Sequence, residues 1–252
     1  ISFTGNMSGM LIADYIMQER KATGTMPENP ALVTTVVTTD MAKAICKYYN
    51  VDCIEVLTGF KYIGEQIKFF EQTGSHNYVF GLEESYGCLA GTYTRDKDSI
   101  VAVMMLAEVA SFYKKQGKTL WDAMIDLYEK YGYYREGQTT KELKGASGAV
   151  EIQKIMDSFR QNPPTELGGL KVLERRDYKI DEKVNNVTGE TSKTGLPTSN
   201  VLYYQLENDA WCCVRPSGTE PKIKFYFGVK GTSLEDANAK LEVLKNAMVG
   251  EE

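Results

Sequence analysis

Several features that mark particular protein classes are missing from this sequence. It has one histidine, His76, and five cysteines without a Cys-x-x-Cys pair, so nothing has the ligand spacing of a zinc site. No run of about 20 apolar residues occurs, and 22 glycines and 7 prolines in 252 residues exclude collagen-like and low-complexity chains. Basic residues number 29 against 34 acidic ones, a net charge of −5. We expect no nucleic-acid partner, because nucleic-acid phosphates bind basic faces and this chain is acidic. The lack of a long apolar run likewise predicts no membrane partner.

The cysteines indicate a reducing compartment. They are odd in number and scattered, and two adjacent cysteines on a strand point to opposite faces, so a disulfide between them is unfavourable. We interpret all five as small core residues of a soluble cytoplasmic protein: Cys46, Cys53, Cys88, Cys212 and Cys213. His76 lies in a polar stretch and is interpreted as a loop residue. The chain starts at Ile1 without a signal-peptide pattern, so either a leader has been removed or this is a piece of a longer protein, and we favour the second interpretation.

Alternation of strands and helices predicts an α/β domain over residues 30–145, a mixed sheet with flanking helices. Residues 1–29 are interpreted as a remnant of a preceding domain, a strand end at Ser2–Asn6 and a helix, followed by a linker. Strands are expected at Leu32–Val37, Cys53–Leu57 and Asn77–Gly81. Helices are expected at Asp40–Tyr49, Tyr62–Phe70, Ile100–Tyr113 and Leu120–Lys130. The third of these helices is apolar nearly all round and is therefore predicted to be buried between layers.

Residues 146–252 predict a smaller α+β domain with an antiparallel sheet, because strands are grouped together there. A helix is expected at Val150–Arg160, with strands at Lys171–Tyr178, Val201–Leu206, Ala210–Val214 and Ile223–Val229. Asn185–Asn200 is interpreted as a surface loop. Ser233 and Asp236 form a capping-box-like start of the last helix, whose apolar stripe is Ala237, Leu241, Leu244 and Met248.

The sequence Arg-Pro-Ser-Gly-Thr-Glu-Pro, residues 215–221, lies between two predicted strands and suits an anion. Arg215 can bind phosphate oxygens bidentately. Ser217 and Thr219 place hydroxyls around Gly218, whose missing side chain lets backbone N–H groups approach. The stretch from Arg215 to Lys230 carries a net charge of +3, with Lys224 among its cations. The alternative is a rigid hairpin loop with solvated lysines.

Two further loops follow predicted strands, where ligands of α/β sheets bind. Glu83 and Ser85 lie in Gly81–Gly87, and their side chains can hydrogen-bond sugar hydroxyls; the alternative is an acidic loop at a helix entry. Thr58, Gly59 and Lys61 lie in Leu57–Tyr62, where the lysine can reach a phosphate or hydroxyl. The alternative for this second loop is an ordinary strand-to-helix turn.

Taken together, Thr58-Gly-Phe-Lys61, Glu83-Glu84-Ser85 and the Arg215–Pro221 loop resemble the α-D-phosphohexomutase superfamily, closest to its bacterial phosphoglucomutase/phosphomannomutase branch. The resemblance implies that residues 30–145 are the third domain, reading sugar hydroxyls with Thr58, Gly59, Lys61, Glu83 and Ser85. It implies that residues 146–252 are the fourth domain, holding the non-reacting phosphate with Arg215, Ser217, Gly218, Thr219 and Lys224. Lys61 is also a possible catalytic residue.

The activity implied by the resemblance is interconversion of glucose 1-phosphate and glucose 6-phosphate, through a phosphoserine enzyme and a hexose 1,6-bisphosphate that also serves as activator. Members of the family carry the phosphoserine, and a Mg²⁺ held by three aspartates, in domains that precede the ones found here. No serine in that context and no Asp-x-Asp-x-Asp loop precedes the first helix, so this chain resembles the carboxyl-terminal half and is expected to be inactive alone. Its expected partners are a sugar phosphate and the missing amino-terminal domains.

Two alternatives stay open from the sequence. The hydroxyl-reading loops tolerate several sugars, so the chain can belong to a mutase for mannose phosphate or pentose phosphate. A non-catalytic module that binds sugar phosphates would use the same loops. Some members carry a histidine after the Glu-x-Ser core, but Tyr86 and Gly87 stand there, so no histidine acid/base can be assigned.

Overall fold

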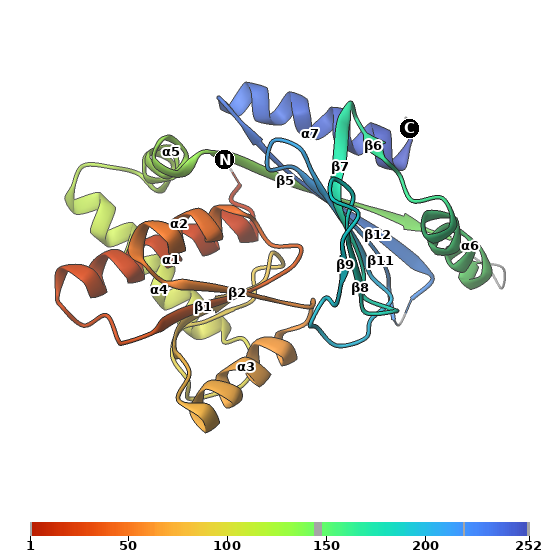
Figure 1. The fold of residues 1–252 in the computed structure, drawn as a ribbon. Helices are drawn as coiled ribbons and strands as arrows, with labels where there is room; N and C mark the ends of the chain where they lie inside the picture. Colours follow the sequence, from red (N-terminus) through yellow and green to blue (C-terminus); the bar gives the residue numbers. More distant parts are fainter. Residues whose placement is uncertain (1, 144–147, 219, 251–252) are drawn as a thin grey trace. The chain divides into compact units, whose positions relative to one another are not determined.

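Two stretches of the chain each build a sheet of their own (Figure 1). The computed structural model describes residues 2–143, 148–218 and 220–250. Contacts divide the chain into two units, Ile1–Gly132 and Tyr133–Glu252. The first unit alternates strands with helices, and the second groups its strands together. The predicted fold class, a mixed sheet with flanking helices followed by an antiparallel sheet, is confirmed.

The sheet of the first unit has the strand order β2-β1-β3-β4. Strand β1 is parallel to both neighbours, and the short β4 is antiparallel to β3. The strands are β1 (Pro30–Thr35), β2 (Asp52–Val56), β3 (Asn77–Leu82) and β4 (Cys88–Leu89). The helices are α1 (Gly5–Ala22), α2 (Met41–Tyr49), α3 (Phe60–Thr73), α4 (Ser99–Lys115) and α5 (Leu120–Tyr131). Helices α2 and α3 make the crossovers that parallel strands require.

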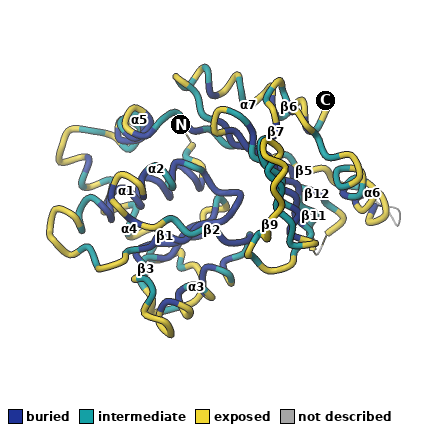
Figure 2. The backbone as a smooth tube through the Cα atoms, viewed as in Figure 1, coloured by how far each residue is buried: buried dark blue, intermediate teal, exposed yellow. Residues whose placement is uncertain are grey.

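Helices cover both faces of this sheet (Figure 1). On one face, Phe60, Ile63 and Ile67 of α3 share an apolar cluster with residues of β1 and β2. Helices α1, α2 and α5 contact one another on the other face. Strand β1 is therefore buried on both sides, which explains its continuous apolar run Ala31-Leu32-Val33 (Figure 2).

The amino-terminal segment differs from the prediction. No strand forms at Ser2–Asn6: the Thr4 side chain instead caps α1, its Oγ1 accepting a hydrogen bond from the Met7 N–H at 3.2 Å. Helix α1 is buried along most of its length and contacts α2, α4, α5 and β3. It therefore packs inside the first unit, whereas residues 1–29 were expected to be left over from a preceding domain.

Helix α4 forms where a helix was predicted, but the expectation that it is buried was wrong. Only Val109 and Tyr113 are buried among its residues. Ile100 and Val103 are 79% and 70% exposed. An apolar sequence favours burial, yet the described residues of the first unit leave the Ile100 and Val103 side chains of α4 largely uncovered.

The second unit forms one antiparallel sheet of eight strands in the order β5-β12-β11-β10-β7-β8-β9, with β6 paired to β7. The strands are β5 (Tyr133–Glu142), β6 (Glu166–Leu167), β7 (Leu170–Asp177), β8 (Glu182–Asn185), β9 (Thr191–Ser192), β10 (Leu202–Leu206), β11 (Trp211–Pro216) and β12 (Lys222–Gly231). The helices are α6 (Gly148–Gln161) and α7 (Leu234–Val249). β9 lies within the stretch that was predicted to be loop, and β5, β6 and β8 were not predicted.

Strand β5 moves the division of the chain. Its ten residues pair in register with Lys222–Gly231 of β12, so it belongs to the second unit. The sequence placed the boundary near residue 146, within a segment outside the described residues. The compact units meet instead at residues 132 and 133. The strand was missed because it is largely polar, Tyr-Tyr-Arg-Glu-Gly-Gln-Thr-Thr-Lys-Glu.

Both helices of the second unit pack on the sheet. Ile152 and Met156 of α6 and Leu244 and Met248 of α7 join one apolar cluster with the strands. The predicted stripe of α7 is confirmed, and Ser233 caps this helix by accepting from the Asp236 N–H at 3.1 Å. All five cysteines are free, and four of them are buried as expected, whereas Cys53 is only half-buried.

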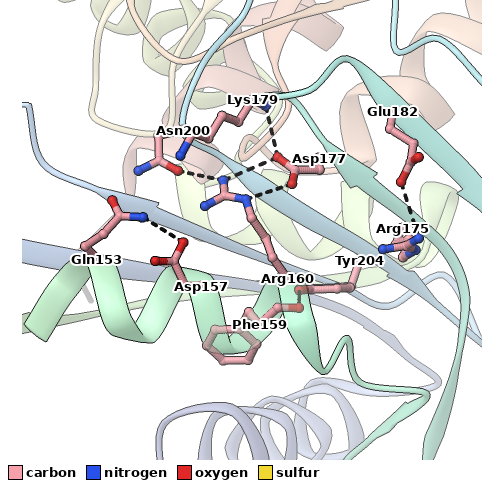
Figure 3. A network of polar contacts seen from close by, with 10 residues as sticks. All are labelled: Gln153, Asp157, Phe159, Arg160, Arg175, Asp177, Lys179, Glu182, Asn200 and Tyr204. Carbon is pink, nitrogen blue, oxygen red and sulfur yellow. Dashed lines mark hydrogen bonds and ion pairs between the residues drawn. The ribbon is translucent and has the colours of Figure 1, made fainter.

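A largely buried ion pair joins α6 to β7 (Figure 3). The Arg160 guanidinium donates through Nε to Asp177 Oδ2 at 2.7 Å and through Nη2 to Asn200 Oδ1 at 2.6 Å. Asp177 Oδ1 also accepts from the Lys179 N–H at 3.0 Å. The pair thus joins the helix, the strand and the chain just before β10.

Candidate functional site

The parallel strands of the first unit bring three loops to one edge of the sheet. Because β1 lies between β2 and β3 and runs parallel to both, the loops that follow these strands meet at their carboxyl ends. Thr58 and Gly59 follow β2, and Glu83 and Ser85 follow β3. His76, in contrast, lies before β3 and bonds Asp52 at the start of β2 (3.1 Å), at the opposite edge.

Glu83 joins two of these loops. Its side chain is buried, and Oε1 accepts a hydrogen bond from the Gly59 N–H at 3.0 Å. Gly59 has φ 121°, a backbone conformation that favours glycine. The structure therefore brings together two of the residues singled out from the sequence, Glu83 and Gly59, in one hydrogen bond.

Lys97 also reaches this carboxylate and was missed from the sequence. Its Nζ lies 3.5 Å from Glu83 Oε2. The neighbouring Asp98 caps α4 by accepting from the N–H groups of Ile100 and Val101, which fixes the chain next to Lys97. The available signal was the charged run Arg95-Asp-Lys-Asp98 directly before an apolar helix. A carboxylate beside an ammonium can both accept from and donate to the hydroxyls of a sugar.

The other predicted residues of this edge are more open. Ser85 is exposed and lines a cavity of about 330 Å³ together with Lys97. Thr58 is half-buried. Lys61 is exposed, with Nζ 4.6 Å from the centroid of the Tyr62 ring.

Threonines at the end of β1 form a third part of the edge that sequence reasoning did not single out. Thr35 and Thr38 are buried and share a hydrogen bond of 2.8 Å between their hydroxyls. Thr35 Oγ1 also donates to Glu84 Oε2 at 3.4 Å. The sequence signal that could have indicated this part of the edge is the group of four threonines within Val33–Thr39. Through the bond from Thr35 to Glu84, these hydroxyls contact the loop that follows β3.

Cys88 lies beside this edge but is not suited to nucleophilic chemistry. Burial raises the pKa of its thiol to about 11, and the negative charge of Asp98 acts in the same direction. The thiol therefore stays protonated near neutral pH, and the thiolate is the nucleophilic form.

In the second unit, the predicted anion loop is a hairpin between β11 and β12. The Ser217 N–H donates to the Lys222 carbonyl at 2.7 Å, and Ser217 Oγ accepts from the Glu220 N–H at 3.3 Å. A side chain at Gly218 would meet nothing within 4 Å, so the space on that side is open. Glu220 raises the pKa of Lys222 through a hydrogen bond to its ammonium. Thr219 lies outside the described residues.

Arg215 and Lys224 stand directly opposite each other at the base of this hairpin, paired in antiparallel register. Cross-strand partners share a face of the sheet, and like charges in that position repel. Thr140 of β5 pairs with Lys224 on its other side. Two cations and a hydroxyl side chain on adjacent strands form an arrangement that an anion would stabilise.

Neither a membrane span nor a metal cluster emerges from the structure. Over residues 2–143, 148–218 and 220–250, no helix is both long and apolar enough to cross a bilayer. Within the same residues, no group of three or more His, Cys, Asp and Glu side chains could hold a metal ion.

Comparison with known proteins matches both units. The family model described as phosphoglucomutase/phosphomannomutase, alpha/beta/alpha domain III, matches residues 4–131, and the model of the phosphoglucomutase/phosphomannomutase C-terminal domain matches residues 170–245. Phosphoglucomutases from Staphylococcus aureus strains bovine RF122 and N315 are each 36% identical over 248 residues, covering 98% of this chain and 43% of their own length.

Solved structures share the fold at low identity. Parafusin, a phosphoglucomutase from Paramecium, superposes with a TM-score of 0.64 at 16% identity, covering 98% of this chain and 41% of that one. A putative phosphomannomutase from Thermus thermophilus gives 0.60 at 15% identity, covering 97% and 40%.

Both units of the chain thus match successive domains of one class of enzymes. The chain belongs to the phosphoglucomutase/phosphomannomutase family. It spans about 43% of the length of the curated relatives it matches.

Proposed function

We propose that this chain supplies the sugar-binding and phosphate-binding parts of a phosphohexomutase that interconverts glucose 1-phosphate and glucose 6-phosphate. The observation that carries the proposal is the Glu83 carboxylate, held at the sheet edge by Gly59 and Lys97, in a chain of this family. Glu83 and Ser85 would bind sugar hydroxyls, with Thr58, Gly59 and Lys61 shaping the same edge. The structures with low identity support the fold alone.

The phosphate that is not reacting would lie against Arg215, Ser217, Gly218 and Lys224. The repulsion between Arg215 and Lys224 across the ladder falls when a dianion lies between them. Thr219 is expected to contribute to the same loop. Binding energy from a remote phosphate can orient the reacting end of the sugar, which raises the rate rather than only the affinity.

The phosphoserine, the bisphosphate intermediate and Mg²⁺ are part of the proposed activity of a whole mutase. The described residues do not fit a Mg²⁺ site, since no group of three or more His, Cys, Asp and Glu side chains among them could hold a metal ion. We expect the 252 residues alone not to convert glucose 1-phosphate. A coupled assay for glucose 6-phosphate above a heat-killed control would contradict this.

The direct test is a titration of the isotope-labelled chain with α-D-glucose 1,6-bisphosphate, read from amide NMR shifts. We expect shifts at residues 83–87 and at Ser217 and Gly218 in the millimolar range. Inorganic phosphate should shift only the hairpin.

The Arg215→Ala variant tests the phosphate contact in the same titration. It removes a bidentate, charge-assisted contact worth about 2–3 kcal/mol and should weaken bisphosphate binding on the order of 30- to 150-fold. Arg215→Lys should restore part of the affinity, because it keeps the charge without the fork geometry. If the bisphosphate shifts the amide signals neither of residues 83–87 nor of Ser217 and Gly218, the proposed function is disproved.

A further inference from the structure

The loop that carries Glu83 and Ser85 has an unusual backbone. Tyr86, the residue after Ser85, has φ 68°, in the left-handed region that side-chain-bearing residues rarely adopt. The Glu83 N–H donates to the Gly87 carbonyl at 2.8 Å, which closes the loop on itself. Such a conformation persists only when the surroundings hold it in place.

The start of α1 packs directly against this backbone. A Cβ atom added to Gly5 would lie 2.1 Å from the Glu84 carbonyl oxygen and 2.6 Å from the Tyr86 nitrogen. Both are backbone atoms, so no flexible side chain can turn away to make room. Gly5 is thus the residue type that allows the helix and the loop to touch at this point.

The Tyr86 side chain adds a second attachment to the same segment. Its hydroxyl donates to the Phe3 carbonyl oxygen at 3.1 Å, although the ring is 65% exposed. Phe3 in turn packs edge-on against Trp121 of α5, with ring centroids 6.3 Å apart. The loop is therefore connected through Phe3 to two helices of the first unit.

We propose that Gly5 and Tyr86 are positioning residues that fix where Glu83 and Ser85 stand and thereby set selectivity among sugar epimers. The inference rests on the proposed function. Gly5 and Tyr86 act through the loop and do not themselves bind the sugar. Glu83 is held from the opposite side by Gly59, so the loop lies between two attachments. Displacing one of them would move the two sugar-binding side chains relative to Gly59. Geometric errors of about 1 Å in such contacts have large effects on binding and rate.

The test measures Kd values of the chain for α-D-glucose 1-phosphate, α-D-mannose 1-phosphate and inorganic phosphate by NMR titration. The two sugars differ at one hydroxyl, and inorganic phosphate reports on the hairpin of the second unit. We expect Tyr86→Phe to weaken glucose 1-phosphate binding about two- to tenfold and Gly5→Ala on the order of tenfold or more. Both variants should reduce the ratio of the Kd for mannose 1-phosphate to the Kd for glucose 1-phosphate. The Kd for inorganic phosphate should stay unchanged.

Two control variants make the same chemical changes elsewhere. Tyr48→Phe removes the hydroxyl of another exposed tyrosine, and Gly137→Ala adds a Cβ whose nearest neighbours would be Leu241 side-chain atoms at an ordinary contact distance of 3.4 Å or more. Both controls should bind as the unaltered chain does. Tyr86→Phe removes one exposed hydrogen bond and should leave the Tm unchanged. If Gly5→Ala does not fold, Tyr86→Phe alone therefore tests whether the loop attachment affects sugar selectivity.

Unchanged sugar affinity and unchanged epimer ratio in Tyr86→Phe and in folded Gly5→Ala would overturn the inference while the proposed function stands. An unaltered chain that binds neither sugar phosphate would overturn the proposed function, and the inference with it.

Discussion

At the scale of single residues, the sheet edge of the first unit depends on one buried acid. Glu83 meets a backbone donor on one oxygen and an ammonium on the other, Gly59 at 3.0 Å and Lys97 at 3.5 Å. Lys97 itself is exposed, so its charge is partly screened by water. A polar ligand that enters here can exchange one of these contacts for its own hydroxyl without leaving the carboxylate unsatisfied.

The first prediction concerns Glu83→Gln, which keeps the size of the side chain and removes its charge. A hydrogen bond to a charged group contributes about 1.5–3 kcal/mol, so we expect affinity for glucose 1-phosphate to fall roughly ten- to a hundredfold. The measurement is the NMR titration described above. Glu65→Gln, on the exposed side of α3, is the matched control. Equal Kd values for Glu83→Gln and the unaltered chain would mean that Glu83 only shapes the loop.

At the scale of elements, a helix in each unit shows that sequence character and environment can separate. Helix α4 is apolar in sequence yet leaves Ile100 and Val103 largely exposed. Helix α6 is more polar, yet it is fixed to β7 by the Arg160 and Asp177 pair, whose side chains are 15% and 8% exposed. In α6, Ile152 and Met156 are buried against the sheet while the paired Arg160 lies beside them, whereas α4 leaves apolar side chains exposed.

The second prediction tests that ion pair by Asp177→Ala. Removing one partner of a buried pair leaves the other charge uncompensated, so the free energy of unfolding should fall by about 3 kcal/mol. Urea titration followed by circular dichroism measures it. Asp157→Ala on α6, whose carboxylate accepts from the exposed Gln153 side chain, is the control and should change stability by less than about 0.5 kcal/mol. Equal losses in both variants would contradict a special role for the pair.

At the scale of the whole chain, two units each contain their own apolar cluster. The second unit begins at Tyr133 with β5, an edge strand that covers the full length of β12. An edge left open along ten residues would expose unpaired N–H and C=O groups. The unit should therefore tolerate a cut before β5 and not one after it.

The third prediction compares two polypeptides, residues 133–252 and residues 146–252. The longer one should unfold cooperatively on heating and remain monomeric. The shorter one lacks β5 and should aggregate or show no cooperative transition, because β12 becomes an open edge next to the core. Calorimetry and size-exclusion chromatography measure both properties. If the two polypeptides have the same Tm and elute as monomers, β5 is dispensable and the division at residue 146 is the better one.

Much of this architecture follows from local sequence patterns. The strands Leu32–Val37 and Asn77–Gly81 were recognisable because both faces of a central parallel strand are apolar. The cap at Ser233 and the apolar stripe of α7 depend on residues three and four apart, which are neighbours on any helix. The loop Arg215–Pro221 was recognisable because its arginine, hydroxyls and glycine are adjacent in the chain.

Other features depend on contacts between residues far apart in the sequence, and these only the tertiary structure decided. The pairing of β5 with β12 joins residues 133–142 to 222–231. A polar stretch of ten residues carries no local pattern that indicates which strand it pairs with. Lys97 reaches Glu83, and Gly5 touches the Glu84 carbonyl across almost 80 positions of chain. Local patterning determined which segments are helices, strands and ligand-suited loops, because those properties depend on near neighbours. Which side chains meet at the sheet edge was decided by how the segments pack, since packing is set by the whole unit at once.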